Sequence, residues 1–297
     1  MDRERCSGTA AVDLLKFITS LHRNLCMPGI REPYVAGAFY PADKESLLEL
    51  LEQLARKAAS PKLPRRPKIL VVPHAGYVYS GLTAMHGYLT LAEFPAPSVA
   101  LVLGTKHTPY GHDYALADYE YWLTPLGPVK ENLGLVDCLS SSFPVDNLAH
   151  ELEHSIEVQL PFLQYIYGER CPQIVPLVAA EPSPAVAEQA AAAFRKALAG
   201  TDWLMIVSTD FTHYEPQEIA EKKDRLALED VLSLDYYKLY NDIIKYNISI
   251  CGAAVLLVAV CLARQLGLEG RLLHYSTSGD ATGDYSAVVG YAAVAFY

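Results

Sequence analysis

Residues 68–77 read Lys-Ile-Leu-Val-Val-Pro-His-Ala-Gly-Tyr, and this stretch decides the fold. A continuous run of branched apolar residues is typical of a parallel strand that is buried on both faces. The run stops at Pro73, and His74 follows directly. The stretch therefore predicts a central parallel strand whose carboxyl end presents a histidine.

Two other stretches repeat this design. Residues 99–104 form an apolar run that leads to His107, and residues 203–207 form another that leads to Asp210 and His213. In an open α/β sheet, ligands bind outside the carboxyl ends of the strands. We therefore expect the three strand ends to be neighbours at one edge of the sheet and to form one composite site.

Helical signals lie between these strands. Asp43 can cap a helix whose leucines recur at helical spacing, residues 81–91 predict a crossover helix, and residues 184–198 predict an alanine-rich helix. Without an internal repeat or a clear linker, one domain is favoured. The pattern predicts an α/β fold with a mostly parallel central sheet and helices on both faces.

Composition narrows the function classes. A chain of 297 residues, 51% of them hydrophobic, can bury the core of one large domain. Its net charge of -10 argues against a nucleic-acid partner. Six cysteines without a Cys-x-x-Cys pair fit a reducing compartment, so we expect a cytoplasmic protein. We expect no membrane span, because the most apolar run, residues 252–263, is shorter than the roughly 20 residues that a span needs.

Residues 150–154, His-Glu-Leu-Glu-His, match a zinc-peptidase motif. That chemistry needs both histidines one turn apart in a stable helix. A helix over about 148–167, capped by Asn147 and bent or split by Pro161, is predicted here, but no third ligand of the extended motif follows. We interpret the match as chance and expect His150 to be exposed, so that His150→Ala leaves metal content and stability near wild type.

Two further features suggest chemistry. Asp210 and His213 are three residues apart after a strand, so the carboxylate could orient the imidazole as a base or ligand. Cys251 precedes the apolar run 252–263, where the helix dipole favours a thiolate for metal binding or nucleophilic attack. The alternative is that the histidines belong to unrelated turns and the cysteine to the core.

Taken together, six motifs resemble the Memo family (mediator of cell motility), and the resemblance runs from about Arg31 to the end of the chain. In order, they are residues 35–41 (Val-Ala-Gly-Ala-Phe-Tyr-Pro), 73–77 (Pro-His-Ala-Gly-Tyr), 104–107 (Gly-Thr-Lys-His), 153–161 (Glu-His-Ser-Ile-Glu-Val-Gln-Leu-Pro), 208–213 (Ser-Thr-Asp-Phe-Thr-His) and 250–252 (Ile-Cys-Gly). The resemblance implies a fold similar to the class III extradiol ring-cleaving dioxygenases, which use non-haem iron(II). It also implies an N-terminal extension over residues 1–30 and one domain over residues 31–297.

The resemblance implies a cleft lined by His74, His107, His213 and Cys251, with metal binding by the two strand-end histidines and the cysteine. The dioxygenases hold iron with two histidines and a carboxylate. Here Cys251 stands where a carboxylate is expected, and a soft thiolate also suits copper or zinc. We therefore expect a divalent metal, iron(II) first, with copper or zinc as alternatives.

If the site is catalytic, His213 is the expected base, oriented by Asp210, and it is also a candidate metal ligand. Glu153 and His154 are expected beside the ligands as further catalytic or pocket residues.

Three function classes stay open at this point. The first is a metal-dependent, dioxygenase-like oxidoreductase for a small molecule, and the many tyrosines suit an aromatic one. The second is a non-enzymatic regulatory protein that binds a peptide or a metal. The third is a hydrolase with a triad of Cys251, His213 and Asp210.

Overall fold

The structure is a computed structural model that describes residues 29–59 and 61–297. Two of the six cysteines, Cys6 and Cys26, lie outside the described residues, as does nearly all of the expected N-terminal extension. The division at residue 30 therefore stays a prediction.

The strands are β1 (Ile30–Arg31), β2 (Ile69–Val72), β3 (Val99–Thr105), β4 (Tyr114–Leu116), β5 (Tyr121–Thr124), β6 (Gly127–Lys130), β7 (Gln173–Ala179), β8 (Trp203–Ser208), β9 (His213–Glu215), β10 (Gly270–Thr277) and β11 (Val288–Phe296). The α-helices are α2 (Lys44–Lys57), α3 (Tyr77–Leu89), α4 (Leu133–Leu139), α5 (Leu160–Tyr167), α6 (Pro184–Ala197), α7 (Gln217–Leu232), α8 (Tyr236–Tyr246), α9 (Ala253–Leu266) and α10 (Gly279–Thr282). Short 3-10 helices are η1 (Asn147–Ala149), η2 (Glu157–Gln159) and η3 (Gly168–Arg170).

The main sheet is mixed. Its strand order is β10-β11-β2-β8-β3-β7-β4, and β9 pairs with β11 outside this path. The four central strands β2, β8, β3 and β7 are parallel, whereas β11, β10 and β4 pair antiparallel at the flanks. The expected parallel pairing is thus limited to the centre of the sheet. The strands at its edges, β10, β11 and β4, run antiparallel to their neighbours because no crossover connection brings them in parallel. A second, small sheet joins β1, β5 and β6.

The three decisive strand ends are neighbours, as expected. Strand β8 lies between β2 and β3 and is parallel to both. Val72 is paired with Ser208, and Leu103 with Val207. The segments that follow these strands, with His74, His107 and Asp210, therefore leave the sheet at the same edge.

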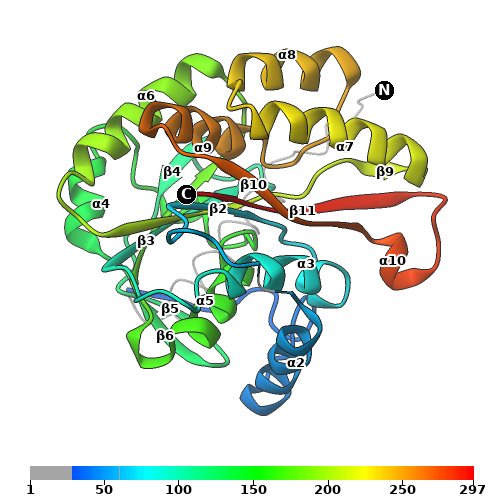
Figure 1. Cartoon of the computed structure of the whole chain (residues 1–297). Helices are drawn as coiled ribbons and strands as arrows, with labels where there is room; N and C mark the ends of the chain where they lie inside the picture. Colours follow the sequence, from blue (N-terminus) through cyan, green and yellow to red (C-terminus); the bar gives the residue numbers. More distant parts are fainter. Residues whose placement is uncertain (1–28, 60) are drawn as a thin grey trace, which may run out of the picture.

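Helices cover both faces of the sheet (Figure 1). Side chains alternate along β2, so that Ile69 and Val71 pack into one core with α9 and α6, while Leu70 and Val72 pack into another with α3 and α5. Figure 1 shows α6, α7, α8 and α9 above the sheet and α2, α3 and α5 below it. A strand buried on both faces needs apolar residues throughout, which is why the central strands are continuous apolar runs.

Several predicted helices are confirmed. Asp43 caps α2 by accepting a hydrogen bond from Ser46 N at 2.8 Å, and α6 and α9 follow the alanine-rich and apolar stretches. Within the described part of the chain, no helix is long and apolar enough to cross a bilayer.

The predicted helix over about 148–167 is wrong in its first half. Residues 150–156 form turns, and only α5, after η2, is an α-helix there. The reason is tertiary. Glu153, Ser155 and Glu157 are buried and bond to groups elsewhere in the fold, so their side chains hold the backbone in turns instead of a helix.

Candidate functional site

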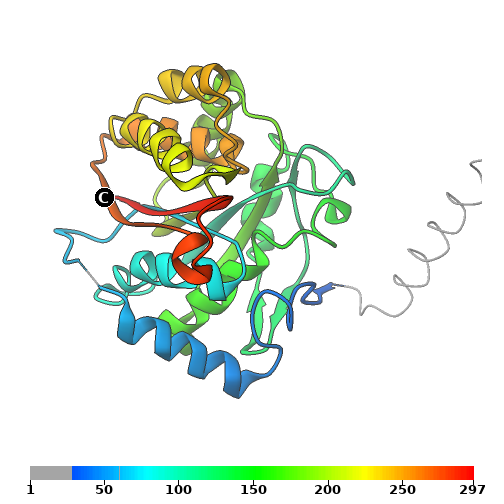
Figure 2. The same cartoon turned by 90° about the vertical axis from the view of Figure 1, so that its right-hand side faces the viewer.

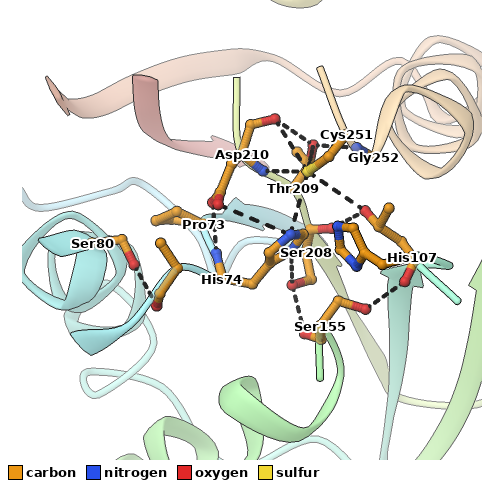
Figure 3. Close-up of polar contacts among 12 residues, drawn as sticks. Pro73, His74, Ser80, His107, Ser155, Ser208, Thr209, Asp210, Cys251 and Gly252 are labelled. Carbon is orange, nitrogen blue, oxygen red and sulfur yellow. Dashed lines mark hydrogen bonds and ion pairs between the residues drawn. The ribbon is translucent and has the colours of Figure 1, made fainter. Parts of the chain in front are cut away.

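The segments that follow β2, β3 and β8 meet the 150–156 turns and the start of α9 at one cavity of about 890 Å³. Its lining includes the predicted site residues His74, His107, His154, Asp210, His213 and Cys251. The composite site expected from the strand ends is therefore formed. Figure 3 shows His74 at its centre, with Asp210, Cys251 and His107 around it.

His74 is held in one tautomer by Ser208. The Ser208 hydroxyl donates to Ser155 O at 2.6 Å and accepts from Gln159 Nε2 at 2.8 Å. Its single proton is therefore used, so the 3.0 Å contact with His74 Nδ1 requires that the imidazole donates. The lone pair of His74 is then on Nε2, which lies 3.3 Å from Cys251 Sγ. This is the form that a metal ligand needs.

His107 is fixed by the carboxylate of Glu153. Its backbone N donates to Glu153 Oε2 at 2.6 Å, and its Nδ1 lies 3.0 Å from Oε1, so Nε2 is the ring nitrogen left for a metal, which would have to displace its proton. Burial opposes the charge of His107, but hydrogen bonds to Cys251 and Glu153 and the charge of Glu153 raise its pKa to about 9. Burial alone would raise the pKa of Glu153, yet bonding to His107 and the nearby imidazole charges lower it to about 2.

His154 completes a cluster of three imidazoles. One ring nitrogen of each of His74, His107 and His154 can be chosen so that all three lie within 4.8 Å of one another. Burial and then the charge of His74 lower the pKa of His154 to about 3, so it is neutral at pH 7. A neutral imidazole is the metal-binding form. His154, expected only as a catalytic or pocket residue, is therefore placed as a candidate ligand.

Cys251 lies just before α9, as expected, and its thiol faces the cluster. Sγ accepts from Asp210 N at 3.2 Å in addition to its contact with His74. Gly252 makes this approach possible, because a Cβ there would lie 2.5 Å from Thr209 Cβ. Cys251, the two strand-end histidines and His213 line one cavity, but metal binding by these four residues stays a prediction.

Asp210 does not orient His213, so that part of the prediction is wrong. Asp210 Oδ1 accepts from His74 N at 2.8 Å, whereas His213 bonds through Nδ1 to Ser249 O and through its backbone N to Ser249 Oγ, both at 2.8 Å. The chain turns between the two residues, because Phe211 N bonds to Gly290 O of β11 and carries His213 away from Asp210. His213 lines the cavity with its Nε2 lone pair free, but it stands apart from the three-imidazole cluster.

This arrangement also separates the members of the expected hydrolase triad. The imidazole in contact with Cys251 Sγ is that of His74, and its Nδ1 is bound to Ser208 rather than to a carboxylate. His213 makes its described hydrogen bonds to Ser249 instead. The geometry therefore does not assemble a triad of Cys251, His213 and Asp210.

Three supporting residues were not singled out by sequence reasoning. Ser208, Gln159 and Ser249 orient the imidazoles through hydrogen bonds that span 36 to 134 positions of the chain. Serine and glutamine carry no local signal for such a role, although Gln159 and Ser208 fall within the motifs that carried the family resemblance.

His150 is buried, contrary to expectation. It is 0% exposed, its Nε2 lies 3.1 Å from Ala115 O, and its ring packs edge-on against Trp122. His154 alone of the two motif histidines joins the imidazole cluster. The zinc-peptidase geometry, with both histidines on one helix face, is absent from the described residues.

We expect His150→Ala to lower the free energy of unfolding of the metal-free protein at pH 7.5 by about 2–4 kcal/mol, because it empties a packed site. The earlier expectation of unchanged stability is thereby replaced. Urea denaturation measures the change. The matched control is His112→Ala, whose side chain is 65% exposed, and there the loss should stay below about 1 kcal/mol.

The same variant tests a pH effect. Burial lowers the pKa of His150 from 6.5 to about 4 in the folded state. Between pH 6.5 and about pH 4, His150 therefore binds a proton in the unfolded chain but not in the folded protein. The stability contributed by neutral His150 is lost as the pH falls through this range. The destabilisation caused by His150→Ala should shrink by about 2 kcal/mol between pH 7.5 and pH 5. An equal loss at both pH values would contradict this account.

Comparison with known proteins agrees with the motifs. Residues 31–295 match the family model described as Memo-like protein. The chain is 42% identical to a MEMO1 family protein of Ignicoccus hospitalis and 42% identical to one of Methanopyrus kandleri, each over 90% of this chain and 98% of the relative. It is 41% identical to a MEMO1 family protein of Thermotoga neapolitana over 88% of this chain and 98% of the relative.

Proposed function

The chain belongs to the Memo family, and we propose that it is a metal-dependent, dioxygenase-like oxidoreductase acting on a small aromatic molecule. One observation carries the proposal. Ligand-capable nitrogens of His74, His107 and His154 lie within 4.8 Å of one another at the wall of a cavity of about 890 Å³. Clustered imidazoles beside a cavity of this size are typical of a metal site that also admits an organic ligand.

The donor set fits a divalent transition metal. The Nδ1 atoms of His74 and His107 are engaged by Ser208 and Glu153, which leaves Nε2 of each as the nitrogen that could bind a metal; at His107 the metal would displace a proton. Imidazoles suit iron, copper and zinc, and the thiol of Cys251 adds a soft donor 3.3 Å from His74 Nε2. We propose iron(II) because the family resemblance implies a fold similar to the extradiol dioxygenases, which use iron(II); copper and zinc are the alternatives.

When bound, the metal would supply Lewis acidity and access to one-electron steps. In a dioxygenase reaction, both atoms of dioxygen enter the substrate and the substrate supplies the electrons, so no separate reductant is needed.

The chain's own residues would position the groups and move protons. His213 Nε2, free because Nδ1 donates to Ser249 O, would accept the proton of a substrate hydroxyl. Glu153 holds His107 in its ligating orientation, and Asp210 holds the backbone of His74. Phe39 and Tyr291 line the cavity, and their rings would limit the access of water to the reacting centre.

The proposal is tested on protein purified under anaerobic, reducing conditions. Titration with iron(II), copper(I) and zinc(II), followed by calorimetry and metal analysis, should give about one bound ion per chain. Oxygen uptake should then require both iron and an added phenol. Absence of metal binding would overturn the proposal. Tight binding without oxygen uptake with any phenol would instead support the second candidate, a regulatory protein that binds metal without turnover.

A further inference from the structure

The cavity is much larger than a metal site needs. Beyond the imidazole cluster, it is lined by the start of α3, by β9 and by the connection between β10 and β11, which includes α10. Figure 2 shows this connection facing the viewer, with α10 beside the cyan α3. These elements and the adjoining strand β11 contribute three tyrosines and one carboxylate: Tyr79 of α3, Tyr214 of β9, Tyr291 of β11 and Asp284 of the connection. We call these four residues the tyrosine subsite.

The three tyrosines face a shared space. Tyr291 is buried, while Tyr79 and Tyr214 are 45% and 77% exposed. Burial raises the pKa of Tyr291 most, and electrostatic interaction with Asp210, Tyr79 and Tyr214, which line the same cavity, raises it further. Aromatic faces carry negative electrostatic potential and attract cations.

The charge of the tyrosine subsite is negative. The carboxylate of Asp284 accepts from Ser286 N at 2.9 Å and from Ser286 Oγ at 2.7 Å, and these hydrogen bonds lower its pKa. Asp210 is a second carboxylate that lines the cavity. Among the described residues that line the cavity, there is no lysine or arginine, and the groups that can become positive are histidines. The cavity is therefore polarised, with imidazoles in one part and phenols with a carboxylate in another.

Tyr214 adds an independent observation. Its φ of 58° is in the left-handed region, which few residues other than glycine, asparagine and aspartate adopt. Its neighbour His213 is held by Ser249 and by the pairing of β9 with β11, and the Tyr214 ring lies 5.8 Å from the His213 ring. An exposed aromatic residue kept in an unfavourable backbone conformation beside a site residue indicates a function at the cavity.

We propose that the tyrosine subsite binds the organic ammonium or guanidinium group of a ligand whose hydroxyl-bearing ring reaches the imidazole cluster. The ligand class is thus an amine-bearing phenol. A cation stacked on tyrosines and paired with Asp284 replaces water by favourable contacts, whereas an anion at the same place meets like charge. This assignment rests on the proposed function for the orientation of the ligand, but binding at the subsite needs no turnover.

The test uses three phenols that differ in the charge of the para substituent: tyramine (positive), 4-ethylphenol (neutral) and 4-hydroxyphenylacetate (negative). Calorimetry is done on the full chain, both metal-free and loaded with redox-inactive zinc. Tyramine should bind at least about tenfold more tightly than 4-hydroxyphenylacetate, with 4-ethylphenol between them. Equal affinities, or a preference for the anion, in both forms would overturn the assignment.

Variants locate the effect. Asp284→Asn should weaken tyramine binding by about three- to tenfold and leave the affinity for 4-ethylphenol unchanged. Tyr214→Asn should also weaken tyramine binding, yet its melting temperature should equal or exceed that of wild type, because asparagine tolerates the left-handed backbone. Tyr285→Asn is the matched control, since Tyr285 is 48% exposed on the same connection but does not line the cavity, and its affinities should match wild type.

The two proposals fail separately. A preference for tyramine without any metal binding would support the tyrosine subsite and refute the metal-dependent function. Stoichiometric metal binding with no discrimination among the three phenols would support the function and refute the subsite. Loss of tyramine binding in Tyr285→Asn as well would place the effect outside the cavity and refute the subsite.

Discussion

Arg31→Met is expected to lower the free energy of unfolding by about 3–5 kcal/mol, because it leaves a buried carboxylate without its counter-ion. Arg31 is 2% exposed and forms an ion pair with Glu157, which is fully buried. The same carboxylate accepts hydrogen bonds from Tyr34 N at 2.7 Å, Val35 N at 2.9 Å and Tyr40 Oη at 2.7 Å. Loss of the cation therefore affects a network and not a single pair.

Arg31 also reaches the site. Its guanidinium donates to Glu153 O at 2.6 Å and to His150 O at 3.1 Å, and it stacks over the Trp122 ring. These bonds hold the turns that carry Glu153 and His154. We therefore expect Arg31→Met to weaken metal binding as well, although Arg31 does not line the cavity.

Equilibrium unfolding in urea measures the first effect. The control is Arg56→Met, which removes an exposed pair with Glu52 and should change stability by under about 1 kcal/mol. The double variant Arg31→Met with Glu157→Gln should be more stable than Arg31→Met alone, since it removes the unpaired charge. A loss below about 1 kcal/mol in Arg31→Met would show that the buried pair is not what stabilises this region.

The second large effect concerns the ligand set. We expect His74→Ala, His107→Ala and His154→Ala each to lower metal affinity by at least about 100-fold, because each removes one of three converging imidazoles. Glu153→Gln should lower it by about 10- to 100-fold, since it loosens the hold on His107 without removing a ligand. Calorimetric titration of zinc into metal-free protein gives these affinities.

Two variants separate the ligand set proposed from the imidazole cluster from the one implied by family resemblance. His213→Ala should change metal affinity by less than about threefold, because its ring is held by Ser249 outside the cluster. Cys251→Ser tests whether the thiol, which lies 3.3 Å from His74 Nε2, is a ligand. A loss of metal affinity comparable to that in His154→Ala would make the thiol a fourth donor. A larger loss in His213→Ala than in His154→Ala would contradict the proposed set. His112→Ala is the control, because His112 does not line the cavity.

The sequence by itself determined the features that depend on neighbouring residues. The apolar runs of β2, β3 and β8 could be identified because a strand buried on both faces has no polar position. The caps and apolar spacing of α2 and α6 were equally local, so these helices were predicted close to their observed ends. These runs also predicted that His74, His107 and Asp210 meet, because the carboxyl ends of parallel strands lie at the same edge of a sheet.

Only the tertiary structure decided which side chain meets which. His154 joins the imidazole cluster whereas His150 is buried, although the two are four residues apart in one motif. The reason is that residues 150–156 form turns, held by Arg31, instead of the expected helix. His213 bonds to Ser249 rather than Asp210 because β11 turns the chain between them. Such contacts join residues that are distant along the chain, and their geometry depends on the packing of whole elements, which no local periodicity or spacing encodes.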